Sequence, residues 1–244
     1  KQGPDCLRPG YDLVVQAMSG LMASDGKMLN GVPQQITATA VADFSTGLAI
    51  AWSVCAALYA RERTGHGERI ESTLLGTALG IQTSSFINVG MVDAEPRSAF
   101  LEELGHLRNA GCSYEEVTQL YESYRTKPTW NAYYRTYQTK DSVLALGCLS
   151  DILRKKMADA LGVRDIRFEP GYDPDSPETA AFNERLLEQL QAMFRERTTE
   201  EWLEVLDAAG VPAGPVRFIE ELLEDPQVVA NGLVVELEHA QVGP

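Results

Sequence analysis

The sequence predicts an α/β protein in which a helix-rich first part is followed by a smaller α+β unit. In residues 1–110, apolar residues recur every three to four positions, which is the spacing of helices with a buried face. After about residue 126 the pattern changes to an alternating run with a polar turn in its middle, which is typical of a β-hairpin. A chain of 244 residues is long enough for one large domain or two modest ones.

The first part opens with a short helix and continues with a long one. Residues 11–23 have helical spacing and end in a turn at Asp25-Gly26. Residues 41–64 predict a long helix that Gly65 stops. Two arginines occupy the last turn of this helix, where cations suit the helix dipole.

Three further elements are expected before the change in pattern. Residues 68–72 predict a brief strand, and residues 73–90 predict a second apolar helix. Ser113 and Glu116 have the spacing of a capping box, and apolar residues follow them at helical intervals. A third helix is therefore expected to begin at this point.

The second part combines a hairpin with three helices. The run YYRTYQTKDSVLALGC, residues 133–148, alternates, turns at Thr139-Lys140-Asp141 and continues apolar. Helices are expected to follow at 150–161, 178–196 and 199–209. A strand is expected near residues 233–238.

Charge and cysteine usage exclude several classes of function. The net charge of −14 argues against a surface for nucleic acid or anionic membranes, which requires clustered Lys and Arg. A local basic group would still suffice for a small anionic ligand. The four cysteines are widely spaced without a CxxC pair, which predicts reduced thiols and no metal site. No membrane span or signal peptide is visible, so we expect a cytoplasmic protein without a membrane partner.

Asp43 is the most informative residue of the chain. Between residues 30 and 59 it is the only side chain that is charged at neutral pH, and it lies among small and apolar residues. Burying a carboxylate costs several kcal/mol unless it is paired or used, so a functional role is one interpretation. The other is structural: Asp43 opens the helix as an N-cap and accepts N–H bonds from Ser45 or Thr46. The two interpretations are compatible.

The segment ARERTGHGERIE, residues 60–71, is the second candidate. It allows a plain helix end with a solvated basic tip, in which His66 has no role. It also allows a corner that contacts phosphate through Arg61 and Arg63, because guanidinium groups match phosphate oxygens. Elsewhere the sequence contains no P-loop, no GxGxxG and no GxSxG, and Tyr11 taken alone reads as a packing aromatic.

Several segments in order resemble the family III CoA-transferases, the group of formyl-CoA transferase, carnitine CoA-transferase and α-methylacyl-CoA racemase. In the first part they are GYDLVVQAMSGLMASDG and AVADFSTGLAIAWSVCAALYARERTGHGERIESTLLGTAL. In the second they are DILRKKMADALG, TTEEWLEVLDAAGVPAGPV and DPQVVANG. The most specific pieces are the Asp-x-x-Thr-Gly of Asp43 to Gly47 and the Arg-x-Arg-Thr-Gly-x-Gly of Arg61 to Gly67.

The resemblance implies an architecture and an assembly. Family members have a Rossmann-like large domain and a small α/β domain, and two chains interlink as a homodimer. This sequence is then expected to be the central part of a longer chain. Residues 1–110 would belong to the large domain, 111–212 to the small α+β domain, and 213–244 to the linker that returns to the large domain.

The resemblance also assigns roles. Asp43 is the expected nucleophile, and Tyr11, Arg61 and Arg63 are expected to contact coenzyme A, which enters as acyl-CoA; no metal is implied. CoA passes from an acyl-CoA donor to a carboxylic acid through an aspartyl anhydride and an aspartyl-CoA thioester. The site must exclude water, and we expect N-terminal amides of the helix to stabilise the oxyanion.

Two alternatives stay open. A racemase of the same family would have a histidine in the motif where this chain has Tyr11, and tyrosine, with a pKa of about 10, is a poor base at neutral pH. The motif therefore favours transfer. Residues 113–141 contain no glycine, unlike the flexible loop of formyl-CoA transferase, so its substrates are not implied. The second alternative is a non-catalytic assembly module of the same fold.

Overall fold

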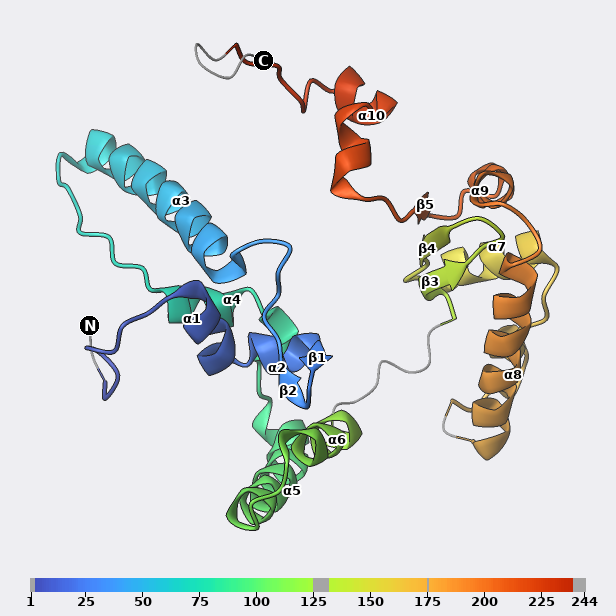
Figure 1. The fold of residues 1–244 in the computed structure, drawn as a ribbon, viewed down its shortest axis with the longest axis horizontal. Coiled ribbons are helices and arrows are strands. Elements are labelled where there is room, and N and C mark those ends of the chain that lie inside the picture. Colours follow the sequence, from blue (N-terminus) through green and yellow to red (C-terminus); the bar gives the residue numbers. More distant parts are fainter. Residues whose placement is uncertain (1–2, 125–131, 175, 239–244) are drawn as a thin grey trace. The chain divides into compact units, whose positions relative to one another are not determined.

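The computed structural model describes residues 3–124, 132–174 and 176–238, and contacts within the chain divide it into two units, Lys1–Lys127 and Pro128–Pro244 (Figure 1). The elements of the first unit are α1 (Asp12–Ser19), α2 (Leu21–Asp25), β1 (Met28–Leu29), β2 (Val32–Pro33), α3 (Val41–Thr64), α4 (Leu74–Gly80), a 3-10 turn η1 (Thr83–Ser85), α5 (Gly90–Asn109) and α6 (Tyr114–Tyr124).

The long helix α3 has the bounds that the sequence predicts. Gly65 ends it with a φ of 75°, a conformation that glycine adopts without steric cost, and its N–H donates to the Arg61 carbonyl oxygen at 2.8 Å. The expected opening helix is divided in two, because Gly20 takes a φ of 86° between α1 and α2. Gly26 ends α2 at the predicted turn, with a φ of 74°.

The prediction of one helix over residues 73–90 is wrong. Thr73 caps α4 by accepting the Gly76 N–H at 3.0 Å, but α4 ends at Gly80 and the chain then turns through η1. Gly80, Ser84 and Ser85 lie at this break, so turn-forming residues in the run outweighed its apolar spacing. Residues 68–72 form no strand, because no described segment pairs with them.

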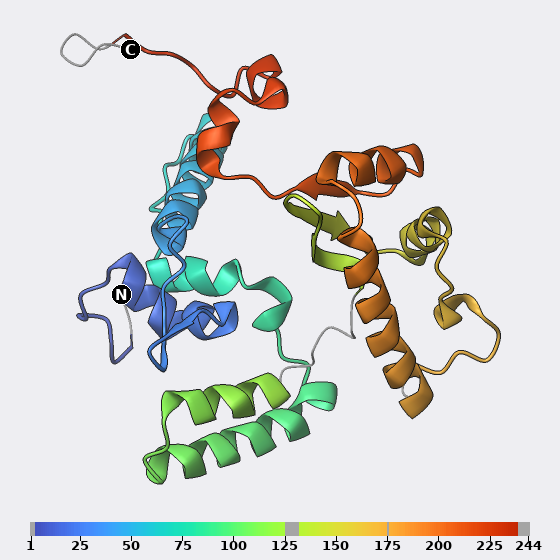
Figure 2. The ribbon, with the colours of Figure 1, turned by 45° about the vertical axis from the view of Figure 1, so that its right-hand side comes forward.

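Helix α5 was not predicted, whereas the capping box before α6 is confirmed. The Ser113 N–H donates to Glu116 Oε2 at 2.7 Å, and the Glu116 N–H donates to Ser113 Oγ at 3.3 Å. Figures 1 and 2 show α5 and α6 lying side by side, and Phe100 stacks on Tyr124 with ring centroids 4.5 Å apart. Residues 111–124 therefore pack as part of the first unit, and the domain bounds that the resemblance implies stay a prediction.

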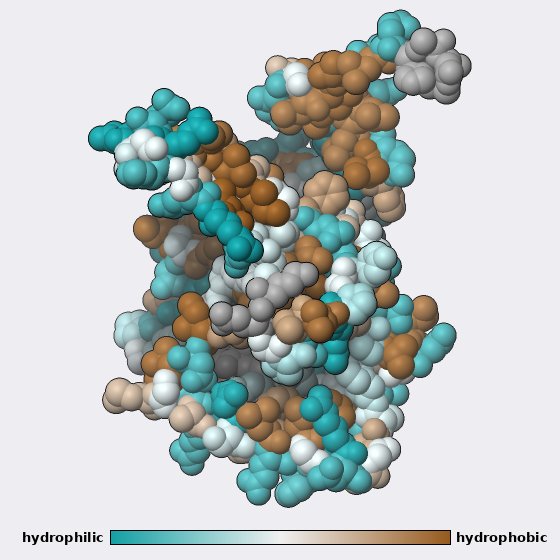
Figure 3. All heavy atoms as spheres, turned by 90° about the vertical axis from the view of Figure 1, so that its left-hand side faces the viewer, coloured by the Kyte–Doolittle hydropathy of each residue, from teal (hydrophilic) through white to brown (hydrophobic). Residues whose placement is uncertain are grey.

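The core of the first unit is small. Val15, Ala42 and Ala78 bring α1, α3 and α4 together, with Leu21 and Leu74 partly buried against them. Most of α3 lies outside this core. Its exposed apolar residues, here called the α3 apolar surface, are Phe44, Leu48, Ile50, Trp52, Val54, Leu58 and Tyr59. Exposed hydrophobic side chains on this side of the molecule are visible in Figure 3.

The second unit contains the predicted hairpin. Its elements are β3 (Tyr134–Gln138), β4 (Val143–Gly147), α7 (Asp151–Leu161), a 3-10 turn η2 (Ile166–Phe168), α8 (Pro177–Phe194), α9 (Thr199–Ala208), β5 (Ala213–Pro215), a 3-10 turn η3 (Ile219–Leu223) and α10 (Pro226–Ala230). The strands pair antiparallel in the order β3-β4-β5, with Tyr137 opposite Leu144. The three predicted helices correspond to α7, α8 and α9.

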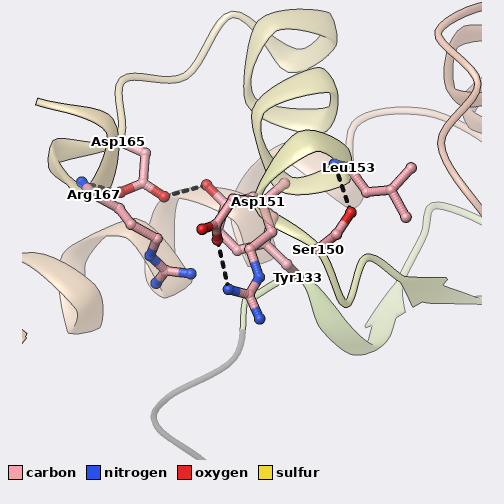
Figure 4. Close-up of polar contacts among 7 residues, drawn as sticks. Tyr133, Ser150, Asp151, Leu153, Asp165 and Arg167 are labelled. Carbon is pink, nitrogen blue, oxygen red and sulfur yellow. Dashed lines mark hydrogen bonds and ion pairs between the residues drawn. The ribbon is translucent and has the colours of Figure 1, made fainter.

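This unit has an extensive core between the sheet and its helices. Phe194 stacks on Tyr137 with centroids 4.5 Å apart, and Trp202 Nε1 donates to the Phe194 carbonyl oxygen at 2.9 Å. Tyr133 donates to the buried carboxylate of Asp165 at 2.5 Å (Figure 4). Burial, and then this hydrogen bond, raise the pKa of the Tyr133 phenol well above its ordinary value, so the phenol is a neutral donor.

The strand expected near 233–238 is absent from the described residues. The segment is irregular, and Leu233, Val235 and Leu237 are exposed. A strand needs the edge of a sheet to satisfy its backbone groups, and no described strand pairs with this segment. Its role as a return linker stays a prediction.

Candidate active site

The first turn of α3 carries Asp43, but Asp43 does not cap the helix. The helix begins at Val41, so Asp43 is its third residue, and the N-cap position is Ala40, whose side chain accepts no hydrogen bond. The predicted N-cap role of Asp43 is therefore wrong. The spacing of apolar residues located the helix but not its first residue, because helical periodicity does not distinguish a cap from the turn after it.

A carboxylate from a different helix supplies the missing cap. Asp12, the first residue of α1, accepts the N–H of Ala42 at 2.7 Å and the N–H of Asp43 at 3.2 Å, both through Oδ1. The N-terminal amides of a helix have no partners inside the helix, and a negative charge close to them is favourable. Asp12 thus acts as the N-cap of α3, although it precedes Ala42 by 30 residues and Asp43 by 31 residues in the sequence.

Asp12 is itself held by Gln16. The Gln16 amide nitrogen donates to Asp12 Oδ2 at 2.6 Å, and its amide oxygen accepts the Ile36 N–H at 2.9 Å. Gln16 is fully buried, so its orientation is fixed by these bonds and by packing. The network joins α1 to the segment that leads into α3.

Neither Asp12 nor Gln16 was predicted from the sequence. The signals present were an acidic residue directly after Gly10-Tyr11 and a glutamine one helical turn later. Such a pair usually stabilises its own helix. Its connection to Ala42 and Asp43 depends on the packing of α1 against α3, which local pattern does not reveal.

The sequence also predicts that Asp43 is buried, and the structure of the described residues shows that this prediction is wrong. Its side chain is exposed, as are those of Phe44 at 66% and Leu48 at 56%. Within the described residues, no side chain donates a hydrogen bond to its carboxylate or forms an ion pair with it. Asp43, Phe44, Gly47 and Leu48 line a shallow depression on α3. The apolar neighbours of Asp43 are exposed because no described residues pack over them.

The remaining residues of the Asp-x-x-Thr-Gly motif explain its composition. Thr46 is buried, and its hydroxyl donates to the Ala42 carbonyl oxygen at 2.7 Å, so it faces the core. Gly47 lies one turn after Asp43 on the same face of the helix. A Cβ at Gly47 would meet nothing within 4 Å, so the missing side chain leaves open space beside the carboxylate. Thr46 thus anchors the motif to the core, while Asp43 and Gly47 lie on the open face of the helix.

Tyr11 and the two arginines lie at opposite ends of α3. Tyr11 is 76% exposed and directly precedes Asp12, whose carboxylate contacts the first turn. Arg61 and Arg63 lie in the last turn, about 27 Å and about 30 Å from Asp43 along the axis at 1.5 Å per residue. The described structure therefore does not bring them to Asp43.

Both arginines have partners on their own helix. Arg63 Nη1 donates to the Tyr59 hydroxyl at 2.6 Å, and Arg61 Nη2 is 3.6 Å from the Glu62 carboxylate. His66 is exposed in the loop that follows, and its side chain makes no hydrogen bond among the described residues. The plain helix end and the phosphate-binding corner both stay compatible with this geometry.

The amides expected to stabilise an oxyanion are already occupied. Those of Ala42 and Asp43 donate to Asp12, and the Phe44 N–H donates to the Ala40 carbonyl oxygen at 2.9 Å. A negative charge at this helix end would compete with Asp12. These three amides are therefore not free to bind a further anion in this structure.

The described part of the chain contains no cluster of three or more His, Cys, Asp or Glu side chains able to hold a metal ion. The same residues include one helix, α3, that is long and apolar enough to cross a membrane, and 11% of its most apolar window is buried. A core helix of a soluble protein passes the same test of length and composition.

The comparison with protein families decides the affiliation. The profile of the family described as CoA-transferase family III matches residues 1–244. The chain belongs to CoA-transferase family III. The resemblance inferred from the motifs is therefore confirmed over the whole of the sequence.

Curated relatives within the family have related transfer activities in their names. The acetyl-CoA:oxalate CoA-transferase of Acetobacter aceti is 26% identical over 234 residues, covering 96% of this chain and 53% of its own. The succinyl-CoA:glutarate CoA-transferase of Mus musculus is 27% identical over 243 residues, covering 99% and 49%. The chain thus spans about half the length of the curated relatives it matches.

Solved structures support the fold. The crystal structure of Rv3272 from Mycobacterium tuberculosis matches with a TM-score of 0.66 at 21% identity, covering 100% of this chain and 57% of that one. A CAIB/BAIF family protein from Brucella suis matches with a TM-score of 0.56 at 25% identity, covering 95% and 54%. The helix-rich α/β architecture with small sheets is therefore that of part of a CaiB/BaiF-type chain.

Proposed function

We propose that this chain carries the nucleophile of a CoA-transferase and that Asp43 is that nucleophile. The Asp43 carboxylate attacks the thioester carbonyl of acyl-CoA, and the CoA thiolate leaves to give a mixed anhydride. The thiolate then attacks the aspartyl carbonyl, which releases the donor acid and forms an aspartyl-CoA thioester. The acceptor carboxylate attacks this thioester, and the freed thiolate attacks the acyl carbonyl of the new anhydride. The products are the new acyl-CoA and the original Asp43.

The observation that supports this assignment is a free carboxylate on a fixed turn. Asp43 has no hydrogen-bonding or ionic partner among the described side chains, while its own N–H is held by Asp12. A nucleophile that is not engaged in a salt bridge keeps its electron pairs available, and a fixed backbone limits its approach directions. The open space at Gly47 gives room for the acyl group.

The same exposure has a consequence for the complete enzyme. Water hydrolyses anhydrides and thioesters, so the working site must be covered. Because the curated relatives are about twice as long as this chain, we infer that further parts of the protein, or a second chain of a homodimer, cover Asp43. The dimer, and the catalysis itself, belong to that complete protein.

We further propose that Tyr11 contacts the CoA thioester end and that Arg61 and Arg63 serve its phosphates. Tyr11 adjoins the turn that carries Asp43, whereas the arginines lie at the far end of α3. CoA carries its phosphates at the opposite end of a long pantetheine arm from its sulfur. Separate contacts at the two ends of a helix therefore suit its shape, and guanidinium groups suit its phosphates.

Covalent trapping tests the nucleophile. The full-length protein is incubated with an acyl-CoA donor and then with hydroxylamine or borohydride, and its peptides are analysed by mass spectrometry. We expect modification at Asp43 alone, and we expect Asp43→Asn and Asp43→Ala to abolish transfer while leaving the fold intact. Asp25→Asn, at an equally exposed carboxylate that ends α2, is the matched control and should stay active. More than a few per cent of wild-type turnover in Asp43→Asn would refute the assignment.

A further inference from the structure

We propose that Asp12, supported by Gln16, is a positioning residue that sets the orientation of Asp43 for attack. This inference rests on the proposed function, because it concerns how the proposed nucleophile is held. It adds a role for two residues that donate no hydrogen bond to the Asp43 carboxylate: Asp12 accepts the backbone amides of Ala42 and Asp43, and Gln16 holds Asp12.

The turn that carries Asp43 has no cap from its own helix. The N-cap position of α3 is Ala40, which has no side-chain acceptor and takes a φ of −71° and a ψ of 78°. An uncapped first turn tends to fray, because its leading N–H groups lack partners. A nucleophile at the third position of such a turn would move with it.

Asp12 removes this freedom from outside the helix. One oxygen of its carboxylate accepts the amides of both Ala42 and Asp43, so the backbone of the nucleophile is itself one of the anchored groups. Hydrogen bonds to an ionised acceptor are roughly twice as strong as bonds between neutral groups. The favourable sign of the helix dipole adds to this attraction.

Packing restrains the opposite side of the same turn. Ala42 is fully buried against Val15 of α1 and Ala78 of α4, while Asp43, the next residue, is exposed. Because Ala42 is held both through its side chain and through its N–H, the first turn has little freedom to rotate about the helix axis. The direction of the Cα–Cβ bond of Asp43 follows from that restraint.

Gln16 fixes the orientation of the Asp12 carboxylate through a hydrogen bond inside the protein, so that this orientation does not depend on water. It donates to the second oxygen of Asp12 at 2.6 Å and accepts the Ile36 N–H at 2.9 Å. A fully buried amide with both ends satisfied is costly to reorient, since rotation would leave buried polar groups unpaired. Asp12 is thereby aimed at α3 rather than at water.

Four variants of the full-length protein test the proposal. Asp12→Ala removes the acceptor, Asp12→Asn keeps one oxygen, and Gln16→Leu removes the support while leaving Asp12 in place. Thr198→Ala, which removes the N-cap of α9, is the control for lost capping elsewhere. The readouts are the single-turnover rate of adduct formation at Asp43, the KM for acyl-CoA, the melting temperature, and amide hydrogen exchange in the peptide that covers residues 40–46.

We expect Asp12→Ala to slow adduct formation by about tenfold to a hundredfold, the cost typical of a nucleophile displaced by about 1 Å. The KM should change by less than about twofold, because binding is not touched. Hydrogen exchange at residues 40–46 should become faster.

Asp12→Asn should recover a rate within about threefold of wild type, since Asn caps about as well as Asp. Gln16→Leu should show a smaller version of the same pattern, and it decides the question if Asp12→Ala does not fold. Thr198→Ala should lower the melting temperature without changing the rate.

Two results would overturn the proposal. If the rate stays at the wild-type level in both Asp12→Ala and Gln16→Leu, Asp12 is a structural cap only. If the rate falls without faster exchange and Asp12→Asn recovers nothing, the Asp12 charge acts on the reacting groups directly. Failure of the proposed function looks different: the wild type would form no adduct at Asp43, whereas the exchange measurement needs no substrate.

Discussion

Asp43 and its neighbours divide their tasks by the face of α3 on which they lie. Ala42 and Thr46 face the core and hold the turn, while Asp43 and Gly47 face outward. Asp12 satisfies the amides that would otherwise be free at this helix end. Ala42 and Thr46 thus hold the turn from its core side and Asp12 holds it from α1, while the Asp43 side chain is left exposed.

At the residue scale, Tyr11 is predicted to serve binding more than chemistry. Tyr11→Phe should keep turnover within about tenfold, and Tyr11→Ala should mainly raise the KM for acyl-CoA, because a large exposed ring offers packing area to a ligand. Steady-state kinetics on the full-length variants measures both effects. Rapid exchange of the α-proton of a 2-methylacyl-CoA for deuterium would instead support the racemase alternative.

Helix α3 shows how far an apolar pattern determines an element. Its bounds agree with the prediction, yet its middle is exposed and forms the α3 apolar surface. An uncovered apolar surface on one long helix exceeds what soluble monomers usually leave open. Another layer of the complete protein is therefore expected to cover it.

At the element scale, a charge placed in the α3 apolar surface should disturb assembly of the full-length protein. Trp52 is 71% exposed here, and Trp52→Glu would place a carboxylate where we expect a dry contact. Sedimentation should then show dissociation or aggregation, whereas Glu62→Gln, at an exposed polar position on the same helix, should behave as wild type. Binding of the wild-type protein to lipid vesicles, lost in Trp52→Glu, would contradict this and favour a membrane role for α3.

The two units differ in how much core they contain. The second has a core in which Tyr133, Leu144, Phe194 and Leu206 are almost completely buried, while that of the first is centred on three residues. Hydrophobic burial is the main favourable term in folding, so the second unit is better able to fold from its own residues.

At the scale of the whole molecule, we predict that the working protein is a homodimer of longer chains with an interface above the standard size of about 1,600 Å². A polypeptide limited to residues 1–244 should be aggregated or poorly folded in its first unit, with hydrogen exchange protection confined to residues 132–215. Sedimentation, circular dichroism and hydrogen exchange measure this. A monodisperse monomer with a sharp thermal transition and protected amides throughout α3 would contradict it.

The sequence by itself determined those features that depend on neighbours along the chain. The bounds of α3, the capping box at Ser113, the hairpin and helices α7 to α9 all follow from local spacing and capping chemistry. The family followed from motifs in order. Elements that need a distant partner were predicted wrongly: residues 68–72 and 233–238 have strand-like composition, but no described strand pairs with them.

Only the tertiary structure decided how Asp43 is held and which residues lie around it. The cap on α3 comes from Asp12, 30 residues before Ala42, and this connection exists because α1 packs on α3 through Val15 and Ala42. The exposure of Asp43 likewise could not be predicted from its apolar neighbours in the sequence, since their burial depends on whether another layer of the protein covers them. Local sequence fixes the conformation of a helix, whereas packing determines what surrounds its side chains.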